Sequence, residues 1–129
     1  MIKTKELMLG NWVYAGAKTQ FPMYVTGIFD DVAYLDFEGN EGDVWEEEEE
    51  DMFPVPLTEK IFNKNGFKCL SGVYYLGKCS NTEFCKDDDG YFYMTANLGE
   101  YKCIEKPIKY VHELQNLLTL AGVEINFKI

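Results

Sequence analysis

Six consecutive acidic residues inside a strand-rich region limit how this chain can fold. The run Glu46–Asp51 lies in the stretch GDVWEEEEEDMFPVP, between Trp45 and Phe53. Because neighbouring residues of a strand point to opposite faces, the run would place carboxylates on both faces of a sheet. Each uncompensated buried carboxylate carries a large desolvation cost. We therefore expect the run on a projecting turn, a helical turn or an exposed edge strand, where charge also prevents aggregation. The predicted acidic surface comprises Glu46, Glu47, Glu48, Glu49, Glu50 and Asp51.

The first 56 residues alternate apolar and polar side chains in short segments that predict strands. Clear examples are residues 9–15, 21–29 and 31–37, which are separated by turns rich in glycine and acidic residues. Five short strands within residues 1–56 are typical of a small curled sheet. We predict an SH3-like small β-barrel for this lobe.

A short helix is predicted to open the second lobe, which covers residues 57–129. Thr58 is placed to cap a helix over residues 59–65, and Gly66 to end it in the left-handed conformation. Phe67 would then fold back onto Phe62, which is the apolar contact typical of such a helix end.

An antiparallel sheet, a longer helix and a last strand are predicted for the rest of that lobe. Strands are expected over residues 68–105, with 68–78 as a single strand and a hairpin turn at Asp89-Gly90. The apolar spacing predicts an amphipathic helix over 108–121, with Pro107 at its start. Strict alternation predicts a C-terminal strand over 123–129. The fold class is α+β.

The charge is distributed unevenly along the chain. The formal net charge is −10, and all twelve basic residues are lysines. Thirteen acids and no base lie between Thr19 and Glu59, whereas nine acids and twelve lysines lie outside that window. Nucleic-acid binding by the acidic lobe is not expected, since phosphate contacts require cations and arginine is the preferred donor.

Two groups of side chains are predicted to contact a protein partner. A small sheet can hardly bury all of its aromatic side chains, and exposed aromatics on such sheets form peptide grooves; the alternative is that they fill the core. The polar face of the longer helix is expected to point to water or to a partner. The predicted contacts are Trp12, Tyr14, Tyr24, Tyr34, Trp45, Lys109, His112 and Asn116.

Enzymatic chemistry is not expected from the motifs of this sequence. His112 is the only histidine, and helical phase places it on the polar face. The segment CKDDDGYFYMTA resembles a calcium loop at Asp87, Asp89 and Gly90 but fails at both ends, and the acidic run lacks converging ligands. No catalytic residue, metal site or cofactor is predicted. A small hydrolase or metal enzyme is the least favoured of three functions considered for this chain. It would need His112 beside a cysteine or a carboxylate.

The four cysteines do not have the spacing of a metal site. Cys69, Cys79, Cys85 and Cys103 include no C-x-x-C pair, and the chain has only one histidine, so a structural zinc site is not expected. The N-terminal apolar run is cut at Gly10-Asn11 before a signal-peptide core could form, and no apolar stretch is long enough to span a membrane. We expect a cytoplasmic protein with reduced thiols.

Three motifs resemble a family of small uncharacterised proteins from gut-dwelling anaerobic bacteria and their mobile elements. They are LMLGNWV, FPVPLTEKIFNKNGF and IKYVHELQNLLTLAGVEI, at the start, middle and end of the chain. The family has no assigned activity, so the resemblance supplies no site residue. It implies a bacterial accessory protein, borne on a phage or another mobile element.

These observations favour a non-enzymatic protein-interaction module whose partner is unknown. The alternative is an acidic inhibitor that mimics nucleic acid and occupies the basic groove of a DNA- or RNA-binding protein.

Overall fold

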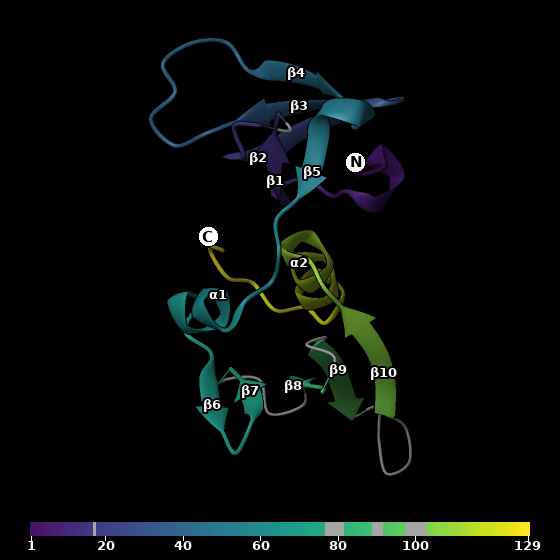
Figure 1. Ribbon diagram of the computed structural model, residues 1–129, viewed down its shortest axis with the longest axis vertical. Helices are drawn as coiled ribbons and strands as arrows, with labels where there is room; N and C mark the ends of the chain where they lie inside the picture. Colours follow the sequence, from purple (N-terminus) through teal and green to yellow (C-terminus); the bar gives the residue numbers. More distant parts are fainter. Residues whose placement is uncertain (17, 77–81, 89–91, 98–102) are drawn as a thin grey trace. The chain divides into compact units, whose positions relative to one another are not determined.

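The computed structural model describes residues 1–16, 18–76, 82–88, 92–97 and 103–129. These residues form two units. Unit 1 comprises Met1–Pro56 with Tyr110–Asn116, and unit 2 comprises Leu57–Lys109 with Leu117–Ile129. Each unit contains one antiparallel sheet (Figure 1). Together with two α-helices, these sheets confirm the predicted α+β class.

The sheet of unit 1 has the strand order β4-β3-β2-β1-β5, so the fifth strand returns to pair with the first. Its strands are β1 (Trp12–Ala15), β2 (Phe21–Phe29), β3 (Val32–Asp36), β4 (Trp45–Glu48) and β5 (Met52–Pro54). Five short strands were expected here, and β2 has the predicted bounds. The acidic run forms the edge strand β4 followed by a 3₁₀ turn, Glu49–Asp51, as its charge predicts.

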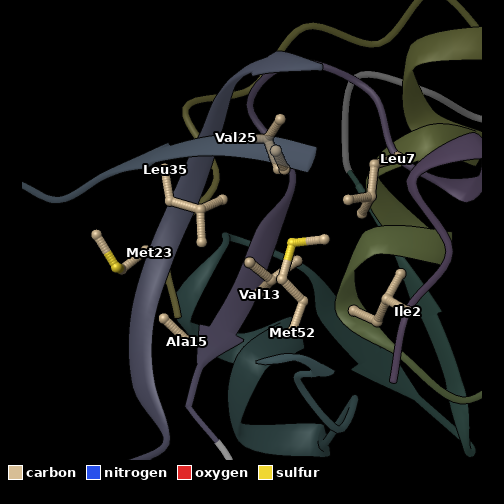
Figure 2. Close-up of a cluster of buried hydrophobic side chains, with 9 residues drawn as sticks. Ile2, Leu7, Val13, Ala15, Met23, Val25, Leu35 and Met52 are labelled. Atoms are coloured by element: carbon tan, nitrogen blue, oxygen red, sulfur yellow. The ribbon is translucent and has the colours of Figure 1, made fainter. Parts of the chain in front are cut away.

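The core of unit 1 lies on one face of this sheet (Figure 2). Alternate residues of the strands supply it, because alternation sends every second side chain to the same face. The segment before β1 completes the core, and the amide of Ile2 donates to the Met52 carbonyl over 3.0 Å. The cluster consists of Ile2, Leu7, Val13, Ala15, Met23, Val25, Ala33, Leu35 and Met52.

The sheet of unit 2 has the order β10-β9-β8-β7-β6. Its strands are β6 (Lys68–Leu70), β7 (Val73–Tyr75), β8 (Thr82–Lys86), β9 (Phe92–Asn97) and β10 (Cys103–Ile108). The prediction of one strand over 68–78 is wrong. Ser71 and Gly72 have φ of +52° and +80°, so the chain turns there in a two-residue hairpin, and Leu70 pairs with Val73. The hairpin of β8 and β9 is confirmed, whereas its predicted turn at Asp89-Gly90 lies outside the described residues.

Helix α1 (Glu59–Lys64) confirms the prediction of a capped short helix. The Thr58 hydroxyl accepts a hydrogen bond from the Ile61 amide at 3.4 Å. At the other end Gly66 has φ of +80°, and the Phe67 amide donates to the Phe62 carbonyl over 3.1 Å. The rings of Phe62 and Phe67 meet edge to face with centroids 5.0 Å apart. This is the Schellman geometry in which glycine avoids a steric penalty.

Helix α2 (Val111–Leu120) begins three residues later than the predicted start at 108. Pro107 lies inside β10 instead of opening the helix, and β10 can hold a proline because it is an edge strand. The helix ends at Leu120 and is followed by Gly122, with φ of +74°, and the Val123 amide donates to the Leu118 carbonyl at 2.9 Å.

The predicted strand over residues 123–129 is not formed, although all of these residues are described. The side-chain amide of Asn65 takes the place of a neighbouring strand. It donates to the Lys128 carbonyl over 2.6 Å and accepts from the Lys128 amide over 2.7 Å. Phe127 is buried beside this attachment. Alternation therefore indicated an extended, anchored segment correctly, but not a sheet partner.

We predict that Gly66→Ala destabilises the protein by about 1–2 kcal/mol, because an L side chain at this left-handed position meets the backbone. Gly66→Asn is the matched control and should cost less, since asparagine tolerates this conformation better. Urea unfolding of both variants measures the difference. Equal losses for alanine and asparagine would contradict the assignment of this helix end.

Candidate functional site

Four of the five predicted contact aromatics share the face of the unit 1 sheet opposite the core. Pairing places Trp12 beside Tyr24, and their rings meet edge to face with centroids 5.4 Å apart. Tyr34 pairs with Gly27, where an added Cβ would lie only 3.1 Å from the Tyr34 ring. Together with Tyr14 these residues are partly buried. The four side chains share one face, where the rings of Trp12 and Tyr24 pack together, and each keeps part of its surface exposed.

Trp45 lies on the other face of the same sheet. It pairs with Leu35, and Leu35 pairs with Val25, so the three occupy one row. Leu35 and Val25 are buried, whereas Trp45 is 49% exposed because its strand forms the edge. The five aromatics therefore do not line a single groove. An exposed tryptophan is a favourable contact residue, because it combines a large apolar area with a polar N–H group.

The acidic run follows the edge of the sheet. Glu46, Glu48, Glu50 and Asp51 are exposed, and Glu47 is partly buried. Burial raises the pKa of Glu47 above 4.5, and the charges of Asp51 and Glu48 raise it further. The run thus presents a dense negative surface whose members repel one another.

Glu49 differs from its neighbours, since it holds the N-terminal segment against the sheet. One carboxylate oxygen accepts from the Thr4 amide at 2.8 Å and from the Thr4 hydroxyl at 2.9 Å. The other oxygen lies 3.1 Å from the Lys3 ammonium, and the side chain is only 14% exposed. The Thr4 amide, Lys3 and the Thr4 hydroxyl lower the pKa of Glu49 below 4.5. This role could not be predicted from the sequence, because nothing in a run of six acids distinguishes one carboxylate from the next.

We predict that Glu49 stabilises unit 1 in a pH-dependent way. Because folding lowers its pKa, its contribution is complete above about pH 4.5 and is lost as the pH falls through the lower folded value. Glu49→Gln should therefore be less stable than the wild type at pH 7, and the difference should narrow below pH 4.5. Thermal unfolding between pH 3 and pH 7 measures this, with Glu50→Gln as the control for general charge repulsion. A difference that does not change with pH would contradict the assignment.

His112 and Asn116 do not form an exposed polar face, so this part of the prediction is wrong. His112 is 3% exposed, its ring stacks on Tyr110 at 5.9 Å, and its Nε2 atom lies 3.9 Å from a Glu6 carboxylate oxygen. Asn116 accepts from the buried Asn11 amide group at 2.9 Å and donates to the Glu6 carbonyl at 2.9 Å. Within unit 1, the helix thus uses these polar side chains to hold the segment before β1.

Gln115 contributes to the same attachment, and this role was not predicted from the sequence. Its side-chain oxygen accepts from the Trp12 amide at 2.8 Å, and its side-chain nitrogen donates to the Gly10 carbonyl at 2.9 Å. Helical phase identifies which residues share a face but not what covers that face. Lys109 precedes the helix and is exposed, so it remains a predicted contact.

We predict that Asn116→Ala destabilises the protein by about 1–3 kcal/mol, because the buried Asn11 amide group loses its acceptor. Asn126→Ala, at an exposed asparagine, is the control and should change stability by no more than about 0.5 kcal/mol. Urea unfolding measures both. An unchanged stability for Asn116→Ala would return this residue to the contact surface.

His112, the only histidine of the chain, and the described cysteines are side chains of the kinds that act as bases and nucleophiles in enzymes. A histidine with 3% exposure is not accessible to a substrate, although Glu6 lies near it. Cys69 and Cys85 carry free thiols, whereas Cys79 and the side chain of Cys103 lie outside the description. Burial raises the pKa of Tyr74 to about 12, with Glu59 and Cys69 adding to the shift. Among the described residues, no three histidine, cysteine or acidic side chains are grouped as metal ligands would be.

Comparison with protein-family models, curated proteins and solved structures found no match to this chain. Among the described residues, no helix has the length and apolar character needed to cross a membrane.

Proposed function

We propose that this chain is a non-enzymatic protein-interaction module whose main contact surface is the acidic edge of unit 1. The observation that carries the proposal is the position of β4. This edge strand combines an exposed tryptophan, Trp45, with the exposed carboxylates of Glu46 and Glu48. An exposed aromatic provides contact area, and the surrounding charge selects the partner.

The sign of the charge defines what kind of protein would bind. No base lies between Thr19 and Glu59, and ten of the thirteen acids in that window are exposed. Such a surface repels acidic proteins and speeds the encounter with basic ones. A basic protein surface is therefore the proposed partner class.

The proposal also includes an SH3-like fold for residues 1–56 and a bacterial origin for the chain. A sheet whose last strand returns to its first has the strand arrangement that an SH3-like barrel needs, which supports that assignment for residues 1–56. A cytoplasmic accessory protein of a bacterium or its mobile elements fits the resemblance of the three motifs. Trp12, Tyr14, Tyr24 and Tyr34 extend the proposed contact surface within unit 1. Lys109 belongs to unit 2 and is a separate proposed contact, whereas His112 and Asn116 are withdrawn.

We predict that changing Glu46, Glu48 and Glu50 together to glutamine weakens capture of a basic partner about tenfold, given a few tenths of a kcal/mol to 1 kcal/mol per exposed charge. Glu38→Gln, Glu41→Gln and Asp43→Asn together remove the same charge from the exposed loop before β4 and form the matched control. Affinity capture from the host lysate, at about 50 mM and about 500 mM salt, compares both with the wild type. Equal capture by the edge and loop variants would contradict the proposed surface.

The second candidate function is inhibition of a DNA- or RNA-binding protein by mimicry of nucleic acid. The exposure of ten acids in one window favours it, because the mimic needs many carboxylates and no particular strand edge. In that case the edge and loop variants would weaken capture equally, and nucleic acid would compete with this chain for its partner.

A further inference from the structure

We infer that the outer edge of β4 binds an extended basic segment of the partner as an additional strand. The inference rests on the proposed function and deepens it by naming the form of the partner. Among the described residues of unit 1, no strand pairs with the outer side of β4. An open strand edge offers backbone donors and acceptors in the spacing that an extended peptide matches.

The hydrogen-bond phase of β4 shows which residues offer these groups. Pairing places Val32 opposite Glu48, and the Glu49 amide donates to the Asp31 carbonyl at 3.2 Å. In an antiparallel ladder, hydrogen-bonded pairs alternate with pairs that are not bonded to each other. Glu47 and Trp45 therefore bond to β3. Glu46 and Glu48 direct their backbone N–H and C=O groups outward, away from the sheet.

The side chains of β4 define the sequence pattern of the added strand. Glu46 and Glu48 share one face, and Trp45 and Glu47 share the other. Side chains of the added strand would alternate in the same way. Lysine or arginine would lie beside Glu46 and Glu48, and an apolar residue would lie beside Trp45. The partner segment thus alternates basic and apolar residues.

A second copy of this chain is a poor occupant of the same edge. Pairing two β4 strands would bring glutamates of both copies opposite one another, and like charges in cross-strand positions are destabilising. The charges therefore exclude the copy and admit a basic strand, which is one way natural proteins control open edges.

The test uses a labelled ten-residue peptide of alternating lysine and valine and two variants of the full chain. Glu48→Pro and Glu48→Gln both remove one charge, but only proline also removes the outward N–H group. Glu48 has φ of −80° and ψ of 158°, which proline adopts without strain, and its amide does not bond to β3. Fluorescence anisotropy measures binding, and thermal unfolding checks that both variants melt at the same temperature.

We expect the peptide to bind Glu48→Pro about fivefold more weakly than Glu48→Gln, since one backbone hydrogen bond is lost. A peptide of the same charge with N-methyl groups on alternate amides should bind at least about tenfold more weakly than the parent, and this comparison does not depend on any variant folding. Equal binding of the two peptides, or of the two variants, would overturn strand addition. If neither peptide binds while the edge glutamine variant still loses capture, strand addition fails and the proposed function stands. If neither peptide binds and the variant with glutamine at Glu46, Glu48 and Glu50 captures as much partner as the wild type, strand addition and the proposed function are both overturned.

Discussion

The cost of burying charge determines the architecture of unit 1. A strand with consecutive acids cannot lie inside a sheet, because half of its carboxylates would face the core. The chain places Glu46–Glu48 at the edge and turns Glu49–Asp51 into a 3₁₀ turn. The apolar positions of β1, β2 and β3 then form the centre of the sheet and supply most of the core. The need to keep the acids exposed therefore also determines which strands form the core.

Glu49 links this edge to the N-terminal segment. Its carboxylate accepts from Thr4, and Ile2 and Leu7, two residues before and three residues after Thr4, complete the core. From the other direction, Gln115 and Asn116 hold Gly10, Asn11 and the Glu6 carbonyl through side-chain amides. Polar side chains therefore attach a segment that has no strand of its own. The remaining acids of the run are left on the surface, where they determine which partners can approach.

Local patterns in the sequence predicted local structure well. Alternation identified β1, β2 and β3 of unit 1. Thr58, Gly66 and Phe67 identified both ends of α1, because caps depend only on near neighbours. The predictions failed where contacts with residues distant in the sequence determine the local structure. Residues 123–129 alternate faultlessly but are held by Asn65, and His112 lies on a polar face that is buried in unit 1. The Ser71-Gly72 turn was a missed local signal. For the candidate site, composition predicted the acidic surface. The register of the unit 1 strands was needed to show that Trp45 and the other four contact aromatics lie on opposite faces of the sheet.

The most direct test of this account is amide hydrogen exchange along β4, measured residue by residue by NMR. An open edge strand predicts that Glu46 and Glu48 exchange rapidly, while Trp45 and Glu47, bonded to β3, exchange at least about tenfold more slowly. Protection of Glu46 and Glu48 equal to that of their neighbours would mean that the edge is already occupied, and it would contradict the account.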